Sequence, residues 1–217
     1  MLQKKYVSEQ EANALYDYTD IAEGTGLKRF YLLCTQDNGG LDYHLTDTQL
    51  YSNTYAVGEV QGRQTLAADG SETDTDFDLS PFNTPKTIKG TAVVSIGHWA
   101  RGDSSSTVGS TIQAKIRKWD GTTETEIASA TTAKLTDSNE AETNKIECFK
   151  ITVPQTHFKA GETLRLTIIM TVTNEAGSGG SGAYAHDPMN QDAPNITPST
   201  EETITASNIL LPFKLDL

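Results

Sequence analysis

The amino-acid sequence predicts an all-β protein, an antiparallel β-sandwich of jelly-roll type, with an immunoglobulin-like sandwich as the alternative. In the second half of the chain, apolar and polar residues alternate with period two, which is typical of an extended strand with one buried face. Threonine, which suits the half-exposed side of a sheet, recurs throughout, and no helical pattern separates the runs. The number and length of the runs favour the jelly roll.

The chain divides into an N-terminal arm, residues 1–26, and a sandwich domain, residues 27–217. Ser8 and Glu11 have the spacing of a capping box, in which each side chain binds the backbone N–H of the other residue. A short helix is therefore expected over residues 9–16 of the arm, before a glycine-containing turn leads into the first strand.

Strands of the domain are expected wherever aromatic and aliphatic residues cluster or alternate with polar ones. Asp120-Gly121 favours a two-residue hairpin turn, so the runs on either side of it are expected to pair in antiparallel fashion. The pattern is weak between residues 35 and 85, where one or two short strands are expected within 49–60. The predicted strands are 27–34, 87–99, 112–117, 124–130, 146–153, 164–172 and 209–217.

Residues 69–78 carry a carboxylate at nearly every second position. Such spacing supplies oxygen ligands to a hard cation such as calcium, but the run lacks the glycine and the glutamate of a helix-loop-helix calcium site. A looser calcium site and a solvent-facing acidic edge strand, whose charges oppose aggregation, both remain open.

Residues 174–200 contain a Gly-Ser run and three prolines. This segment is longer and more flexible in composition than a hairpin connection, so we expect a flexible loop, either functional or disordered.

Charge and composition exclude some classes of function. The 29 acidic and 17 basic residues give a net charge of −12, and the basic residues are scattered, which argues against nucleic-acid binding. The sequence shows neither a secretory signal nor a membrane-spanning run, so no membrane partner is expected. Cys34 and Cys148 are expected to be buried thiols of a protein made in a reducing cytoplasm.

Catalytic and metal-binding motifs do not emerge from the sequence. His44, His98, His157 and His186 stand apart, and no Gly-x-Ser-x-Gly motif surrounds a serine. His98 is expected at the margin of the sandwich with a local hydrogen bond. We therefore expect no enzyme, no metal and no cofactor.

Six segments of strand and turn residues together carry a resemblance to a known class of protein. They are residues 16–26 (YDYTDIAEGTG), Phe30-Tyr31, 51–53 (YSN), 115–125 (KIRKWDGTTET), 158–166 (FKAGETLRL) and 211–215 (LPFKL). These segments resemble virion structural proteins of tailed viruses, particularly small jelly-roll capsid-decoration or cement proteins. The resemblance implies a non-enzymatic protein that binds the lattice of a major capsid protein on the virion surface, after synthesis in the host cytoplasm. It also implies a homo-oligomer, with a trimer favoured.

The N-terminal arm offers aromatic and aliphatic anchors of the kind enriched at buried interfaces. Packing of the same residues on their own sandwich is the alternative to docking on a capsid. The expected interface residues are Tyr6, Leu15, Tyr16, Tyr18 and Ile21.

Two other functions compete with capsid decoration. A carbohydrate-binding or host-adhesion sandwich would use Trp99 and Trp119 to stack on sugar rings, with the loop at 174–200 beside them. A hydrolase with a dispersed active site is the third hypothesis, since residues far apart in sequence need not form a motif.

Overall fold

The computed structural model describes residues 25–37, 40–48, 63–68, 72–186 and 207–214 of the chain. All regular structure in these ranges is β-strand, so the prediction of an all-β sandwich is confirmed. Residues 1–24 of the N-terminal arm, with its expected helix, lie outside the described residues, and Thr25 and Gly26 of the arm belong to β1. The strands are β1 (Thr25–Asp37), β2 (Gly40–Thr46), β3 (Arg63–Ala67), β4 (Glu72–Asp78), β5 (Lys86–Gly102), β6 (Thr107–Trp119), β7 (Glu124–Thr131), β8 (Leu135–Ser138), β9 (Thr143–Phe158), β10 (Thr163–Ala176), β11 (Gly180–Ala185) and β12 (Asn208–Lys214).

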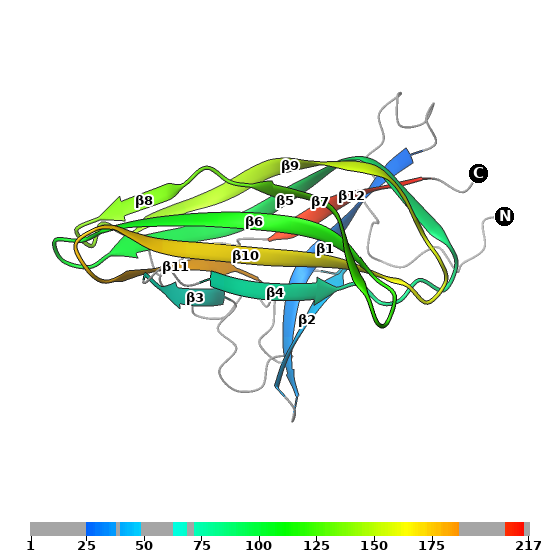
Figure 1. Cartoon of the computed structure of the whole chain (residues 1–217), viewed down its shortest axis with the longest axis horizontal. Coiled ribbons are helices and arrows are strands. Elements are labelled where there is room, and N and C mark those ends of the chain that lie inside the picture. The colour runs from blue at the N-terminus through cyan, green and yellow to red at the C-terminus, as the bar shows by residue number, and fades with distance from the viewer. Residues whose placement is uncertain (1–24, 38–39, 49–62, 69–71, 187–206, 215–217) are drawn as a thin grey trace.

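The strands form two layers around one core (Figure 1). One layer contains β4, β10, β6 and β7, with β8 beside β6, and the other contains β3, β11, β5, β12 and β1, with β9 beside β5. Strand β2 pairs with β1 and then meets β4, which joins the two layers at that edge. Among the described strands, β2 and β4 form the parallel pair, and the other ladders are antiparallel.

Strand β10 shows how the period-two pattern builds the core. Every second side chain points inward, where burial of each large aliphatic group contributes about 1.5–3 kcal/mol. The inward residues are Leu164, Leu166, Ile168, Met170 and Val172, all with 0% exposure.

The predicted hairpin after β6 is present, with a longer turn than expected. The ladder of β6 and β7 closes at Trp119 and Glu124, so four residues form the turn. Asp120 Oδ1 accepts hydrogen bonds from the N–H groups of Thr122 and Thr123 at 2.9 and 2.7 Å. These bonds hold the pKa of the Asp120 carboxyl below its usual value, because they favour its charged form.

The prediction of a flexible loop over residues 174–200 is wrong for the part of this segment that the structure describes. Strand β10 continues to Ala176, and β11 pairs with β3 on one side and β5 on the other. The glycines serve close packing here: a Cβ on Gly182 would lie 2.8 Å from Val172 and 3.0 Å from Ser110. Residues 187–200 lie outside the described ranges.

The two cysteines are free, and they differ in burial. Cys34 is buried, as expected, and its burial raises the pKa of the thiol to about 11. The expectation of burial is wrong for Cys148, which is exposed on β9. Within the described residues, no helix has the length and apolar character needed to cross a membrane.

We expect Gly180→Ala to destabilise the fold by about 2 kcal/mol, because strain and overpacking add at this position. Gly180 has φ +131°, and an added Cβ would collide with Val108 and lie 2.5 Å from the Arg101 carbonyl oxygen. Gly161→Ala is the matched control, since Gly161 has φ +87° with no atom within 4 Å of an added Cβ. Urea unfolding of both variants measures the difference, and equal losses of stability would contradict the packing argument.

Candidate functional site

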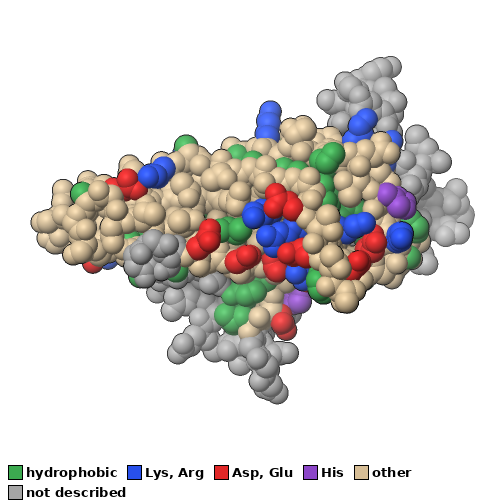
Figure 2. All heavy atoms as spheres, in the orientation of Figure 1, with side chains coloured by type: hydrophobic (Ala, Val, Ile, Leu, Met, Phe, Trp, Pro, Cys, Tyr) green, Lys and Arg blue, Asp and Glu red, His purple; other side chains and the backbone are tan. Residues whose placement is uncertain are grey.

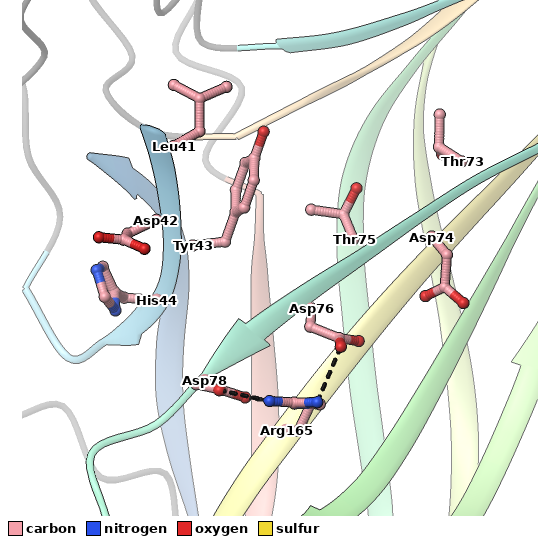
Figure 3. A pocket seen from close by; sticks show the side chains of 10 residues that line it. All are labelled: Leu41, Asp42, Tyr43, His44, Thr73, Asp74, Thr75, Asp76, Asp78 and Arg165. Atoms are coloured by element: carbon pink, nitrogen blue, oxygen red, sulfur yellow. Dashed lines mark hydrogen bonds and ion pairs between the residues drawn. The ribbon is translucent and has the colours of Figure 1, made fainter. Parts of the chain in front are cut away.

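A hollow of about 540 Å³ opens between β2 and β4 (Figure 3). Its volume lies in the range of small-ligand sites, which is about 300–1,000 Å³. Most of the side chains around it are polar, and they come from three strands. The lining residues are Leu41, Asp42, Tyr43 and His44 of β2, Thr73, Asp74, Thr75, Asp76 and Asp78 of β4, and Arg165 of β10.

The hollow forms because β2 and β4 diverge. They pair as parallel strands at a single position, His44 with Asp78, and separate towards their amino ends. On their far sides, β2 pairs with β1 and β4 pairs with β10 along their lengths. Within the described chain, each strand therefore presents an open edge to the hollow.

The alternation of side chains along β4 places acid groups on the outside and apolar groups inside. Phe77 has 0% exposure and packs in the core. Asp74, Asp76 and Asp78 stand on the opposite, outer face, as period two requires. The acidic run thus forms an outward-facing strand, but β4 lies beside β10 and is not a free edge on that side.

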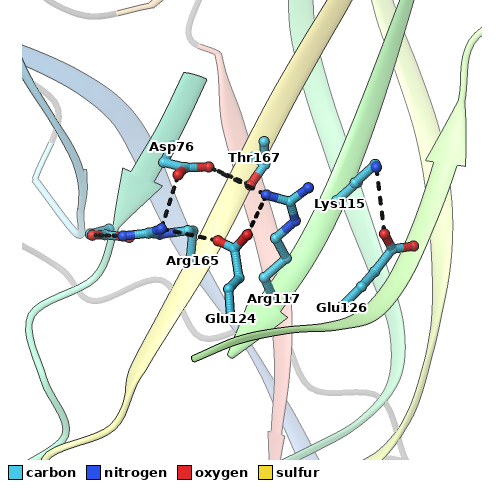
Figure 4. Close-up of polar contacts among 8 residues, drawn as sticks. Asp76, Lys115, Arg117, Glu124, Glu126, Arg165 and Thr167 are labelled. Carbon is cyan, nitrogen blue, oxygen red and sulfur yellow. Dashed lines mark hydrogen bonds and ion pairs between the residues drawn. The ribbon is translucent and has the colours of Figure 1, made fainter. Parts of the chain in front are cut away.

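Arg165 neutralises two of these carboxylates. Its Nε and Nη2 donate to Asp78 at 2.6 and 2.8 Å, and its Nη1 donates to Asp76 at 2.9 Å and Glu124 at 3.0 Å (Figure 4). The hydrogen bonds that Arg165 donates to Asp78 are the main cause that raises the pKa of Arg165 above its usual value. Its guanidinium also lies 5.1 Å from the centre of the Trp119 ring.

The remaining charge at the hollow is negative. Asp42 and Asp74 are exposed and form no ion pair within the described residues. They come from the two strands that border the hollow, Asp42 from β2 and Asp74 from β4, and their side chains point away from one another (Figure 3). Figure 2 shows the acidic and basic side chains gathered over β4, β10 and β6. No group of three His, Cys, Asp or Glu residues with a metal-binding arrangement occurs in the described ranges.

Tyr43, which lines the hollow, packs inward against buried aromatic residues. Tyr43 packs edge-on against Phe77 at 5.2 Å and against His186 at 5.9 Å between ring centres. Behind Thr75, the side chain of Tyr184 on β11 is fully buried, and burial raises the pKa of its hydroxyl. His186, which sequence reasoning places in a loop, is likewise buried.

A second polar group crosses the core between the layers. His98 Nε2 of β5 and Ser110 Oγ of β6 are hydrogen-bonded at 2.8 Å, and His98 Nδ1 lies 3.8 Å from Glu147 Oε1 of β9. This is the order of groups in a hydrolase triad. However, Ser110 and His98 have 0% exposure, so no substrate carbonyl reaches the serine, and the group joins the two layers.

The expected sugar-stacking role is wrong for Trp99 and stays a prediction for Trp119. Trp99 is 2% exposed and packs with Ala183 and Ala185, so its ring is not accessible. One face of the Trp119 ring carries the Arg165 guanidinium. These two rings do not form a platform for a sugar. The expected interface residues, from Tyr6 to Ile21 in the arm, lie outside the described residues, so that interface stays a prediction.

Sequence reasoning missed Arg165 and the β2 wall of the hollow. The acidic run was visible as a pattern, but its counter-charge stands 87 residues away from Asp78. The signal for the β2 wall is weaker: Asp42 and His44 share one face of a short polar strand, in a region without strong alternation.

The structure was compared with known proteins. A CocE/NonD family hydrolase from Staphylococcus aureus superposes with a TM-score of 0.50 and 13% identity, over 88% of this chain and 37% of the hydrolase chain. An aminopeptidase from a Thaumarchaeota archaeon superposes with a TM-score of 0.49 and 9% identity, over 85% and 36% of the two chains. An infectious bursal disease virus chain reaches a TM-score of 0.27 at 13% identity, over 93% and 49%. Neither a known family nor a curated protein sequence matches.

These findings correct the expected function. The prediction of a non-enzymatic capsid-decorating protein is contradicted, because the superposition with a score of 0.50 is to a hydrolase. The likeness to capsid chains is weak, and the tailed-virus origin, virion location and trimer stay predictions. This chain spans 37% of the hydrolase it matches. It therefore shares the β-sandwich fold of part of a CocE/NonD hydrolase.

Proposed function

We propose that this protein acts as the β-sandwich part of a hydrolase, in which the hollow between β2 and β4 binds a positively charged group of the substrate. The shared fold with part of a CocE/NonD hydrolase supports the link to hydrolysis. The third sequence hypothesis, a hydrolase with a dispersed site, is the one that this proposal develops.

The excess negative charge of the hollow is the observation that carries the proposal. Arg165 balances Asp76 and Asp78, while Asp42 and Asp74 add two exposed carboxylates, one on each of the strands that border the hollow. Carboxylates on two walls of one concave site produce a negative potential that concentrates cations. The net charge of −12 extends this attraction beyond the site.

The buried Ser110–His98–Glu147 group is not the reacting centre in this proposal, since it has no access to substrate. The hollow supplies recognition, and the nucleophile of the hydrolase is assigned to no residue of the described chain. This division is consistent with a match that spans 37% of the hydrolase chain.

Calorimetric titration with lysine ethyl ester tests the proposal, with the doubly N-acetylated, neutral ester as the comparison. We expect the cationic ester to bind and the Asp42→Asn/Asp74→Asn variant to bind it about 5–10-fold more weakly, since an exposed ion pair contributes about 0.2–1 kcal/mol. Glu140→Gln is the matched control, because Glu140 is an exposed acid in a different turn. Binding of the neutral ester with equal affinity, or no binding of either, would overturn the proposal.

A further inference from the structure

We infer that the hollow receives an extended polypeptide segment with a basic side chain, which adds as a strand to the open edge of β4. This inference rests on the proposed function, because it names the substrate class for the same hollow. Three features of the described residues lead to it: a free strand edge, the room beside it and the charges on its walls.

Main-chain N–H and C=O groups on the edge of β4 that faces β2 are available to hydrogen-bond another strand. Strand β4 pairs with β10 from Glu72 to Asp78 on one side, and with β2 only at Asp78 on the other. Alternate N–H and C=O groups of a strand point to each side. The groups between Thr73 and Phe77 that point towards β2 have no ladder within the described chain, and such an edge is a template for another strand.

The fork between the strands provides the room. The single bridge at His44 and Asp78 closes one end of the hollow, and the strands separate over Leu41–Tyr43 and Thr73–Phe77. A strand added to β4 would lie about 4.8 Å from it. Leu41, which is 47% exposed at the rim, offers an apolar contact to such a chain.

The charges select a basic segment. Side chains of an added strand would alternate between the outer and inner faces, as those of β4 do. An outward side chain would stand next to Asp74, which has no ion pair in the described part of the chain, with Asp42 on β2 at the other border of the hollow. A lysine or arginine at this position would pair with charges that Arg165 leaves unbalanced.

The experiment measures binding of a fluorescent hexapeptide of alternating threonine and lysine, blocked at both ends, by anisotropy. Two further peptides carry N-methyl groups on alternate residues, one in each register. Only one register removes the N–H groups that would face β4. We expect that peptide to bind at least about 10-fold more weakly, since each lost hydrogen bond costs about 0.5–1.5 kcal/mol, and the other to bind almost normally.

The variants separate this inference from the proposed function. Asp42→Asn and Asp74→Asn are each expected to weaken the peptide about 2–5-fold, with Glu140→Gln unchanged. If lysine ethyl ester binds but neither N-methylated peptide loses affinity, the strand inference is overturned and the proposed function stands. If neither ester nor peptide binds, both fail. Self-association that depends on Asp42 and Asp74, without peptide binding, would assign the hollow to a second copy and overturn the inference.

Discussion

Replacement of Arg165 by methionine is expected to lower the free energy of unfolding by about 3 kcal/mol. Arg165 is 16% exposed and makes short hydrogen bonds to three carboxylates, Asp78, Asp76 and Glu124. Its removal leaves these like charges close together and partly buried, and breaking a buried ion pair on one side typically costs about 3–5 kcal/mol. The expected cost lies at the low end of this range, because the carboxylates are about one-third exposed and stay partly hydrated.

Lys134→Met is the matched control for this substitution. Lys134 also donates at 2.7 Å to a single carboxylate, Glu175, but its side chain is 48% exposed. An exposed pair of this kind contributes about 0–1 kcal/mol. Urea unfolding at low and high salt measures both variants. If they lose similar stability, the charge network around Arg165 does not hold β4, β10 and β7 together.

The strands themselves were the most predictable part of this protein. Alternation identified the runs that became β5, β6, β7, β9, β10 and β12, because one side of each packs in the core whatever its partner is. Pairing order was not predictable, since it depends on contacts between distant segments. Arg165 shows the same limit: nothing local in β10 indicates that it faces the acidic row of β4.

The Gly-Ser composition of residues 177–182 led to the wrong prediction of a flexible loop where β11 lies. A Gly-Ser run is typical of a linker, and the physical alternative is that small residues allow close approach of backbones. Gly180 and Gly182 take the second role, because side chains from both β6 and β10 would meet an added Cβ there. Context of this kind exists only once the layers have packed, so the sequence pattern alone favoured a loop.

The candidate site was predictable in part for similar reasons. Alternate aspartates correctly indicated an exposed acidic strand, since their spacing is a local property. The hollow arises from the divergence of β2 and β4, and no residue type encodes where two parallel neighbours separate. His98 was expected at the sandwich margin with a local hydrogen bond; it lies instead in the core and bonds across it to Ser110.

This burial of His98 leads to a pH dependence that ordinary surface histidines would not give. Burial lowers the pKa of His98 from 6.5 to about 4, because the charged ring loses water; Glu147 acts in the opposite direction, and Lys145 adds to the lowering. The native state therefore keeps the ring neutral at pH values where the unfolded chain protonates it. The contribution of the neutral His98 ring to the free energy of unfolding is complete above about pH 6.5. It decreases as the pH falls towards 4, by a total of about 3 kcal/mol.

Urea unfolding between pH 5 and 7 measures this effect, since most carboxylates stay ionised over that range. We expect the wild-type protein to lose about 2 kcal/mol between pH 6.5 and 5, and His98→Gln to lose much less, because glutamine does not titrate. Ser110→Ala is the companion variant: it removes the partner of His98 Nε2 and should cost about 1–3 kcal/mol at pH 7, while the slope with pH persists. If the free energy of unfolding depends on pH equally in the wild type and in His98→Gln, the His98 ring is solvated in the native state. That outcome would contradict a buried hydrogen bond between His98 and Ser110 across the core.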